Sequence, residues 1–279
     1  FYFGFYLLTY SLITRNKSYT RPLAIIKKNL MSLNNYWTFE ILPSGNFLHS
    51  VSRIPGNFSI GEDSNAMPLN FLLNSIHFAN KEKSEEVYAI ATFIVALING
   101  YTKMKNIDPE EHNSVWLGNL FKNGEKVHEN YKCDVDLLNI DHFLNQKPKS
   151  NELINQGFDE GLIRNILLYC NAGWNLVNMY KISDEISDFL KDKDDNILNY
   201  VKKSDYKAFG ATANNYSVSG LNARHGKGKN SVPKRIMSIE EASSFIRDLI
   251  KLVLDKYFGF DIKFIPKQDK DFDFESIEW

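Results

Sequence analysis

"SIEEASSFIRDLIKLVLDKYFGF", residues 238–260, contains the clearest structural signal in the chain. Ser238 is followed three residues later by Glu241. This is the spacing of a capping box, in which each side chain binds the other residue's backbone N–H at the start of a helix. Apolar residues then recur every three or four positions along one face: Ala242, Phe245, Ile246, Leu249, Val253 and Tyr257. The pattern predicts an amphipathic helix with one face packed on a core.

Two earlier segments have the same helical period. Residues 160–190 carry a set of large apolar side chains at spacings suited to one or two long helices: Ile163, Ile166, Leu167, Cys170, Trp174, Val177 and Met179. Residues 69–101 contain two further apolar stretches, which we expect to be helices joined by the charged "NKEKSEE". These segments together predict a mainly α fold.

Strand signals lie in the first half of the chain. Residues 36–55 indicate two strands around the turn residues 43–46. Residues 118–151 contain the turn dipeptide Asn123-Gly124 and a second turn around Pro148, which favour short strands or irregular structure. Residues 21–36 predict a short helix that begins near Pro22. We therefore expect an α-rich N-terminal region with some β-hairpin.

Bulk composition narrows the possible partners and compartments. The chain has 279 residues and a formal net charge of −1, so attraction to a polyanion has to be local. Its apolar N-terminal run ends at Thr14, short of the roughly 20 residues that span a bilayer, which predicts a buried strand or helix and no membrane partner. With only Cys133 and Cys170, the sequence favours a reducing, cytoplasmic location.

Several common catalytic motifs are absent from the sequence. It contains no Walker-type phosphate loop, dinucleotide fingerprint, Cys-x-x-Cys, His-Glu-x-x-His or Gly-x-Ser-x-Gly, so we expect no cofactor. Residues 108–113, "DPEEHN", and the group His128, Cys133, Asp141 and His142 lack a recognisable metal-ligand spacing. The first of these is better explained as a helix start, where acids favour the positive end of the helix dipole. No metal site is predicted.

The segment "GLNARHGKGKN", residues 220–230, differs from the rest of the chain in its charge. From Asp205 to Glu240 there is no intervening acid, whereas basic residues are frequent. Glycines permit close approach of a ligand, and an arginine can bind a phosphate through two parallel hydrogen bonds. The helix start at Ser238 would add free N–H groups that suit an anion. A solvated charged loop is the competing interpretation.

The helix pair, this segment with its "ARHG", Pro233, "MSIEEA" and the terminal amphipathic helix together resemble the C-terminal portion of HEPN-like helical proteins of prokaryotic conflict systems. The resemblance covers residues 155–260. It implies an all-α bundle that forms a homodimer, so the expected fold is an α-rich N-terminal region followed by a HEPN-like helical bundle. We divide the chain into a mixed α+β region (1–150), the HEPN-like domain (151–262) and an acidic, aromatic tail (263–279).

The resemblance further implies an RNA-directed effector of antiviral defence or of a toxin system, which acts as a metal-independent endoribonuclease. Arg224 and His225 would be the catalytic pair. The RNA-phosphate contacts would come from Asn222, Lys227, Lys229, Lys234 and Arg235. In active members of the family a His follows the Arg by several positions, whereas here the two are adjacent, and this departure leaves catalysis open.

Two alternatives to this function stay open. The chain could be a non-catalytic sensor or assembly subunit of a defence complex, with Arg224 and His225 bonded to an acid such as Asp184 or Glu185. Alternatively, the first 150 residues could carry the function, through the basic residues of the acid-free stretch 15–39. Partners would then be RNA, a second copy of the chain, or other defence proteins.

Overall fold

The structure is a computed structural model that describes residues 36–42, 57–63, 70–105, 114–127, 137, 140, 144, 152–220, 223 and 233–264. Several predictions lie outside these residues: the elements at 1–13 and 21–35, the second strand of the 36–55 hairpin, the domain boundary near 146–151, and the tail from 265. The described residues are mainly helical with one small sheet, as predicted.

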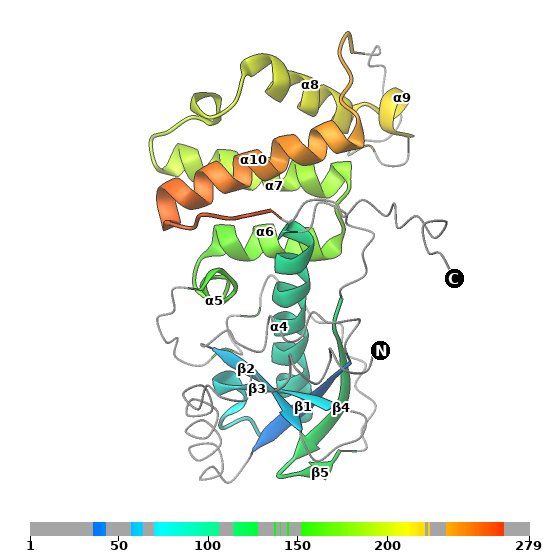
Figure 1. The fold of residues 1–279 in the computed structure, drawn as a ribbon, viewed down its shortest axis with the longest axis vertical. Helices are drawn as coiled ribbons and strands as arrows, with labels where there is room; N and C mark the ends of the chain where they lie inside the picture. Colours follow the sequence, from blue (N-terminus) through cyan, green and yellow to red (C-terminus); the bar gives the residue numbers. More distant parts are fainter. Residues whose placement is uncertain are drawn as a thin grey trace, which may run out of the picture.

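Five strands form an antiparallel sheet at one end of the molecule (Figure 1). The strands are β1 (Trp37–Leu42), β2 (Phe58–Asp63), β3 (Asn70–Ser75), β4 (Trp116–Lys122) and β5 (Glu125–Lys126), in the order β2-β3-β1-β4-β5. The strand prediction for residues 37–42 is confirmed. The turn at Asn123-Gly124 is also confirmed, because both residues have positive φ, 54° and 87°, as a tight hairpin turn requires.

The helix predicted for the start of the 69–101 segment is wrong. Residues 70–75 form β3, followed by one 3₁₀ turn, η1 (Ile76–Phe78). Phe71, Leu73 and Ser75 alternate with less buried neighbours, so the true period is two. Pairing of β3 with both β1 and β2 places this short apolar run in the middle of a sheet, where it satisfies its backbone groups on both sides.

The second part of that segment is the helix α4 (Ser84–Lys105), which connects the sheet to the helical part of the molecule. It is the one described helix that is long and apolar enough to cross a membrane by length and composition. However, 78% of its most apolar window is buried inside the fold. Burial in a protein core accounts for the composition of α4.

The C-terminal half contains α5 (Leu153–Gln156), α6 (Gly161–Ala172), α7 (Leu176–Asp192), η3 (Ile197–Asn199), α8 (Lys203–Asn214), α9 (Tyr216–Ser219) and α10 (Ile239–Phe258). The helical prediction for 160–190 is confirmed as the pair α6 and α7, which Gly173 separates with a φ of 126°. α10 packs on α7, which in turn contacts α6 and α8 (Figure 1).

The helix predicted over 238–260 is confirmed in detail. The Ser238 backbone N–H donates to Glu241 Oε2 at 2.9 Å, and the Glu241 N–H donates to Ser238 Oγ at 3.2 Å. Gly259 ends α10 in the left-handed conformation, with φ 72°. The predicted apolar face is turned inward: Ala242, Ile246, Leu249 and Val253 are fully buried, and Phe245 and Tyr257 are partly buried.

α4 and α6 approach each other closely at Gly100. A Cβ atom placed on Gly100 would lie 1.9 Å from the carbonyl oxygen of Leu167, so only glycine fits this crossing. The apolar core is continuous through this contact. Helices from before and after the expected domain boundary therefore pack directly on each other.

Candidate functional site

The candidate site is residues 220–236, which we call the basic segment. Of its predicted site residues, the structure describes Lys234 and Arg235, and both are exposed. The others lie outside the described residues: Asn222, Arg224, His225, Lys227 and Lys229. The structure describes the two ends of the segment and the helices that hold them.

Both ends of the basic segment are bound to one residue, Thr212 in the last turn of α8. Before the segment, Ser219 Oγ donates to the Thr212 carbonyl oxygen at 2.7 Å. After the segment, the Met237 backbone N–H donates to Thr212 Oγ1 at 3.0 Å. We call these two hydrogen bonds to Thr212 the stem of the basic segment. Thr212 is 1% exposed and Met237 is 5% exposed, so the stem is inside the protein.

Local sequence accounts for the backbone at the two ends of the basic segment. Gly220, directly after α9, has a φ of +55°, a left-handed conformation that glycine adopts without strain. The Ala223 N–H donates to the Gly220 carbonyl oxygen at 3.1 Å and continues the turn. At the other end, the apolar side chain of Met237 is buried beside α8 immediately before the capping box of α10.

Arg235 is paired with an acid. Its Nη1 binds Asp205 Oδ1 in the first turn of α8. The hydrogen bond from Arg235 is the main reason that the pKa of Asp205 lies below its usual range. A phosphate at Arg235 would therefore share this guanidinium with the Asp205 carboxylate. Lys234 is exposed and forms no ion pair with another described residue.

The start of α10 is not the open anion site that the sequence suggested. The Glu241 carboxylate accepts a hydrogen bond from the Ser238 backbone N–H, and the Ser238 hydroxyl accepts one from the Glu241 backbone N–H. Glu240 and Glu241 also place two carboxylates in the first turn of the helix. These charges complement the helix dipole and would repel a phosphate at this position.

The acid pair considered as a partner for Arg224 and His225, Asp184 and Glu185, belongs to α7. Glu185 Oε2 accepts from Asn165 Nδ2 at 2.9 Å, and its carboxylate also hydrogen-bonds the Tyr169 hydroxyl. Burial first, and then the charge of Glu185, raise the pKa of Tyr169. The described partners of Glu185 are thus side chains of the neighbouring helix.

A polar cluster that sequence reasoning missed surrounds Asp195, in the turn after α7. Asp195 Oδ2 accepts from the hydroxyls of Tyr200 and Tyr257 and, at 3.1 Å, from Lys256 Nζ. Hydrogen bonds from Tyr200 first, then from Tyr257, Asn199 and the Asn196 backbone, hold the pKa of Asp195 far below its usual range. Hydrogen bonds to Tyr200 and then Asp195 raise the pKa of Lys256. Every member of the cluster has a hydrogen-bond partner, and the bonds from Lys256 and Tyr257 to Asp195 connect the turn after α7 to α10.

A second unexpected cluster contains two basic residues, buried Arg247 and half-buried Lys103, where α4, α6 and α10 meet. Arg247 lies over the Trp174 ring, 4.4 Å from its centroid, and donates to Ser243 Oγ at 2.7 Å. Lys103 Nζ donates to the Asn171 carbonyl oxygen at 2.8 Å, near the C-terminal end of α6. Burial raises the pKa of the Cys170 thiol well above its usual value, more than the nearby cations lower it. Cys170 is consequently a packed thiol and a poor nucleophile.

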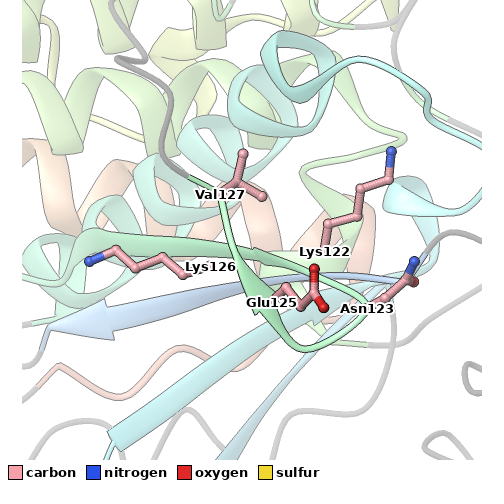
Figure 2. A pocket seen from close by; sticks show the side chains of 5 residues that line it. All are labelled: Lys122, Asn123, Glu125, Lys126 and Val127. Atoms are coloured by element: carbon pink, nitrogen blue, oxygen red, sulfur yellow. The ribbon is translucent and has the colours of Figure 1, made fainter.

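The β4–β5 hairpin borders a pocket of about 480 Å³ lined by Lys122, Asn123, Glu125, Lys126 and Val127 (Figure 2). The amines of the two lysines point to different sides of the hairpin in Figure 2, so they do not converge on one ligand. Lys122 Nζ instead lies 4.6 Å from the centroid of the Trp37 ring. Within the described part of the chain, no group of three His, Cys, Asp or Glu residues could hold a metal ion.

Comparisons of the chain with protein-family models, with curated proteins and with solved structures found no match. The resemblance of residues 155–260 to HEPN-like domains therefore rests on the sequence motifs alone.

Proposed function

We propose that this protein is an RNA-directed effector of a prokaryotic antiviral defence or toxin system, and that the basic segment is its RNA-binding site. The observation that carries the proposal is the stem at Thr212, where both ends of the segment are bound inside the protein. A segment anchored in this way is presented from a rigid frame, which lowers the entropy lost when it binds a ligand.

The charge of the segment supports an anionic ligand. Residues 220–236 contain five lysine and arginine residues, one histidine and no acid. Only one of these cations, Arg235, has a described carboxylate partner. An RNA backbone is a suitable ligand because each phosphate that a cation neutralises releases a counterion.

In the catalytic form of the proposal, His225 removes the proton from a ribose 2′-hydroxyl. The 2′ oxygen attacks the adjacent phosphorus, the bond to the 5′ oxygen breaks, and the leaving oxygen takes up a proton from water. Arg224 stabilises the charge on the transition state by two hydrogen bonds. The products are a 2′,3′-cyclic phosphate and a 5′-hydroxyl, and the reaction uses no metal ion.

The experiment is an RNA-cleavage assay in excess EDTA with the intact chain, Arg224→Ala, His225→Ala and the control Lys83→Ala, an exposed lysine of the other half of the molecule. Loss of a positioned acid–base group should lower the rate by about 10²- to 10⁴-fold. The control should cleave at the parent rate. Equal cleavage by all four proteins would assign the activity to another site or to a contaminant.

A second candidate function is that of a non-catalytic sensor or assembly subunit of a defence complex. The Arg235–Asp205 ion pair favours it, because one cation of the basic segment already binds an acid of the same chain. In this case Arg224→Ala and His225→Ala would lower the free energy of unfolding, and the intact chain would bind RNA without cleaving it. Urea unfolding beside the cleavage assay separates the two candidates.

A further inference from the structure

The face of the sheet that points away from α4 has an exposed tryptophan at one end. Trp116 of β4 is 53% exposed and pairs with Leu42 of β1, which is 48% exposed. On the opposite face, Phe39 packs on α4, with its ring centroid 6.2 Å from that of Tyr88. Because side chains alternate along a strand, Leu42 and Trp116 belong to the outer face. Tryptophan is highly buried on average, so an exposed one beside an exposed leucine marks a surface for a ligand.

A β-bulge places the carboxylate of Glu40 on the same outer face. Glu40 faces two residues of β4, Gly118 and Asn119, because the register of β1 and β4 shifts between Phe39 and Ile41. Glu40 Oε2 accepts from the Asn119 backbone N–H at 3.3 Å and from Asn119 Nδ2 at 2.6 Å. A Cβ atom on Gly118 would lie 2.9 Å from the same oxygen, so the glycine leaves room for the carboxylate against β4.

The charge of Glu40 is oriented but not neutralised within the described part of the chain. Glu40 forms no ion pair there, and its Oε1 accepts no hydrogen bond from a described residue. Gly118, which the carboxylate contacts, is two residues from Trp116, a separation of about 6–7 Å along β4. Lys126 is on the outer face too, but it pairs with Phe121 toward the other end of β4. The end with Trp116 is therefore aromatic and acidic.

We infer that Trp116 and Glu40 form a docking site for an arginine side chain of a protein partner. A planar guanidinium stacks on an aromatic ring and donates hydrogen bonds from its edge, so one arginine can contact the Trp116 ring and Glu40 Oε1 together. Leu42 adds apolar contact beside the ring. Nucleic acid fits this end of the sheet less well, because its phosphates would face the Glu40 carboxylate. The inference goes beyond the proposed RNA function and does not depend on the basic segment.

The test uses the full chain with ¹⁵N-labelled tryptophan, whose indole N–H peaks are followed by NMR. The ligand is the capped tripeptide acetyl-Leu-Arg-Leu-amide, and its matched control contains citrulline, which has the shape of arginine without the charge. The Trp116 peak, assigned from its loss in Trp116→Leu, should shift with the arginine peptide. The citrulline peptide should bind about tenfold more weakly, because it lacks the cation.

Two matched variants test the carboxylate. Glu40→Gln keeps an oxygen for Asn119 and removes the charge, so it should weaken binding of the arginine peptide about tenfold. Glu125→Gln removes the same charge from an exposed position of β5 and should bind like the parent. The indole peaks of buried Trp37 and Trp174 report whether each variant is folded.

Four results would overturn the proposal. The first is an unmoved Trp116 peak, and the second is equal binding of the arginine peptide by the parent and Glu40→Gln. The third is a Trp116 shift with a single-stranded 2′-O-methyl oligoribonucleotide but not with the peptide, which would assign the surface to nucleic acid. The fourth is a parent dimer that separates in Trp116→Leu and ignores the peptide, which would assign it to a second copy of the chain.

Discussion

The backbone N–H of Met237 and the hydroxyl of Thr212 are joined by a hydrogen bond of 3.0 Å that closes the basic segment at its C-terminal end. The same threonine accepts Ser219 Oγ through its carbonyl oxygen at the N-terminal end. Because its hydroxyl also donates to the Ala208 carbonyl oxygen, Thr212 links the segment to the preceding turn of α8. One buried residue, through its hydroxyl and its backbone carbonyl, therefore binds both ends of the proposed RNA site.

Replacing Thr212 by valine should loosen this stem. Valine keeps the branched shape but leaves the buried Met237 N–H without its acceptor, which should cost about 1–3 kcal/mol of unfolding free energy. RNA affinity should fall as well, because the segment would lose its frame. Thr212→Ser, which retains the hydroxyl and removes one methyl, is the matched control. If serine and valine variants are equally destabilised in urea, the hydrogen bond has no role.

Gly100→Ala should be severely destabilising. The added Cβ would lie 1.9 Å from the Leu167 carbonyl oxygen, so α4 and α6 would have to separate. Overpacking of this kind costs about 1–3 kcal/mol or more. Gly161→Ala adds the same methyl at the start of α6, where nothing lies within 4 Å, and should be tolerated. Thermal unfolding of both variants measures the difference, and a Gly100→Ala protein as stable as the parent would refute the close crossing.

Asp195 predicts an acid-dependent loss of stability. Hydrogen bonds lower the pKa of Asp195 in the folded protein. In the unfolded chain the pKa of an aspartate is about 3.9. The folded state therefore binds the proton more weakly. Its stabilising contribution is present above the unfolded pKa and is lost as the pH falls toward the folded pKa.

Urea unfolding between about pH 6 and pH 2 tests this dependence on Asp195. The parent protein should lose stability more steeply than Asp195→Asn below about pH 4. Exposed Asp188, whose carboxylate pairs with Lys191 on the surface of α7, gives the control Asp188→Asn. Parallel pH profiles for the parent and Asp195→Asn would show that the cluster does not depend on the carboxylate.

Ser238→Ala should remove the side-chain half of the capping box at the start of α10. Loss of an N-cap hydroxyl costs about 1 kcal/mol. Ser244→Ala, an exposed serine inside the same helix, should be neutral or slightly stabilising because alanine favours a helix interior. The comparison is made by urea unfolding, and equal stability of the two variants would argue against the cap.

The sequence predicted best the elements that contain local signals. The helix over 238–260 has an N-cap, a three-to-four-residue apolar period and a terminal glycine, and each of these depends on neighbours within one or two turns. The sequence of residues 70–75 does not distinguish a strand from a helix, because a short apolar run fits either period. Their strand state is decided by pairing with β1 and β2.

The candidate site was only partly predictable for the same reason. The basic character of residues 220–236 can be read directly from the sequence, but their anchoring depends on a threonine in α8. Likewise, Asp195 meets Tyr257 only because the turn after α7 folds onto α10. Contacts between residues so far apart in the chain leave no local sequence signal, and a threonine inside a helix is an ordinary residue until its partner is known.

The most direct test of RNA binding by the basic segment is ultraviolet crosslinking of the full chain to a single-stranded RNA, followed by mass-spectrometric mapping of the crosslinked peptide. Our account predicts that the main crosslinks lie within residues 220–236 and disappear in Lys227→Gln/Lys229→Gln. Crosslinks confined to the sheet or to the first 150 residues, with none in the basic segment, would contradict it.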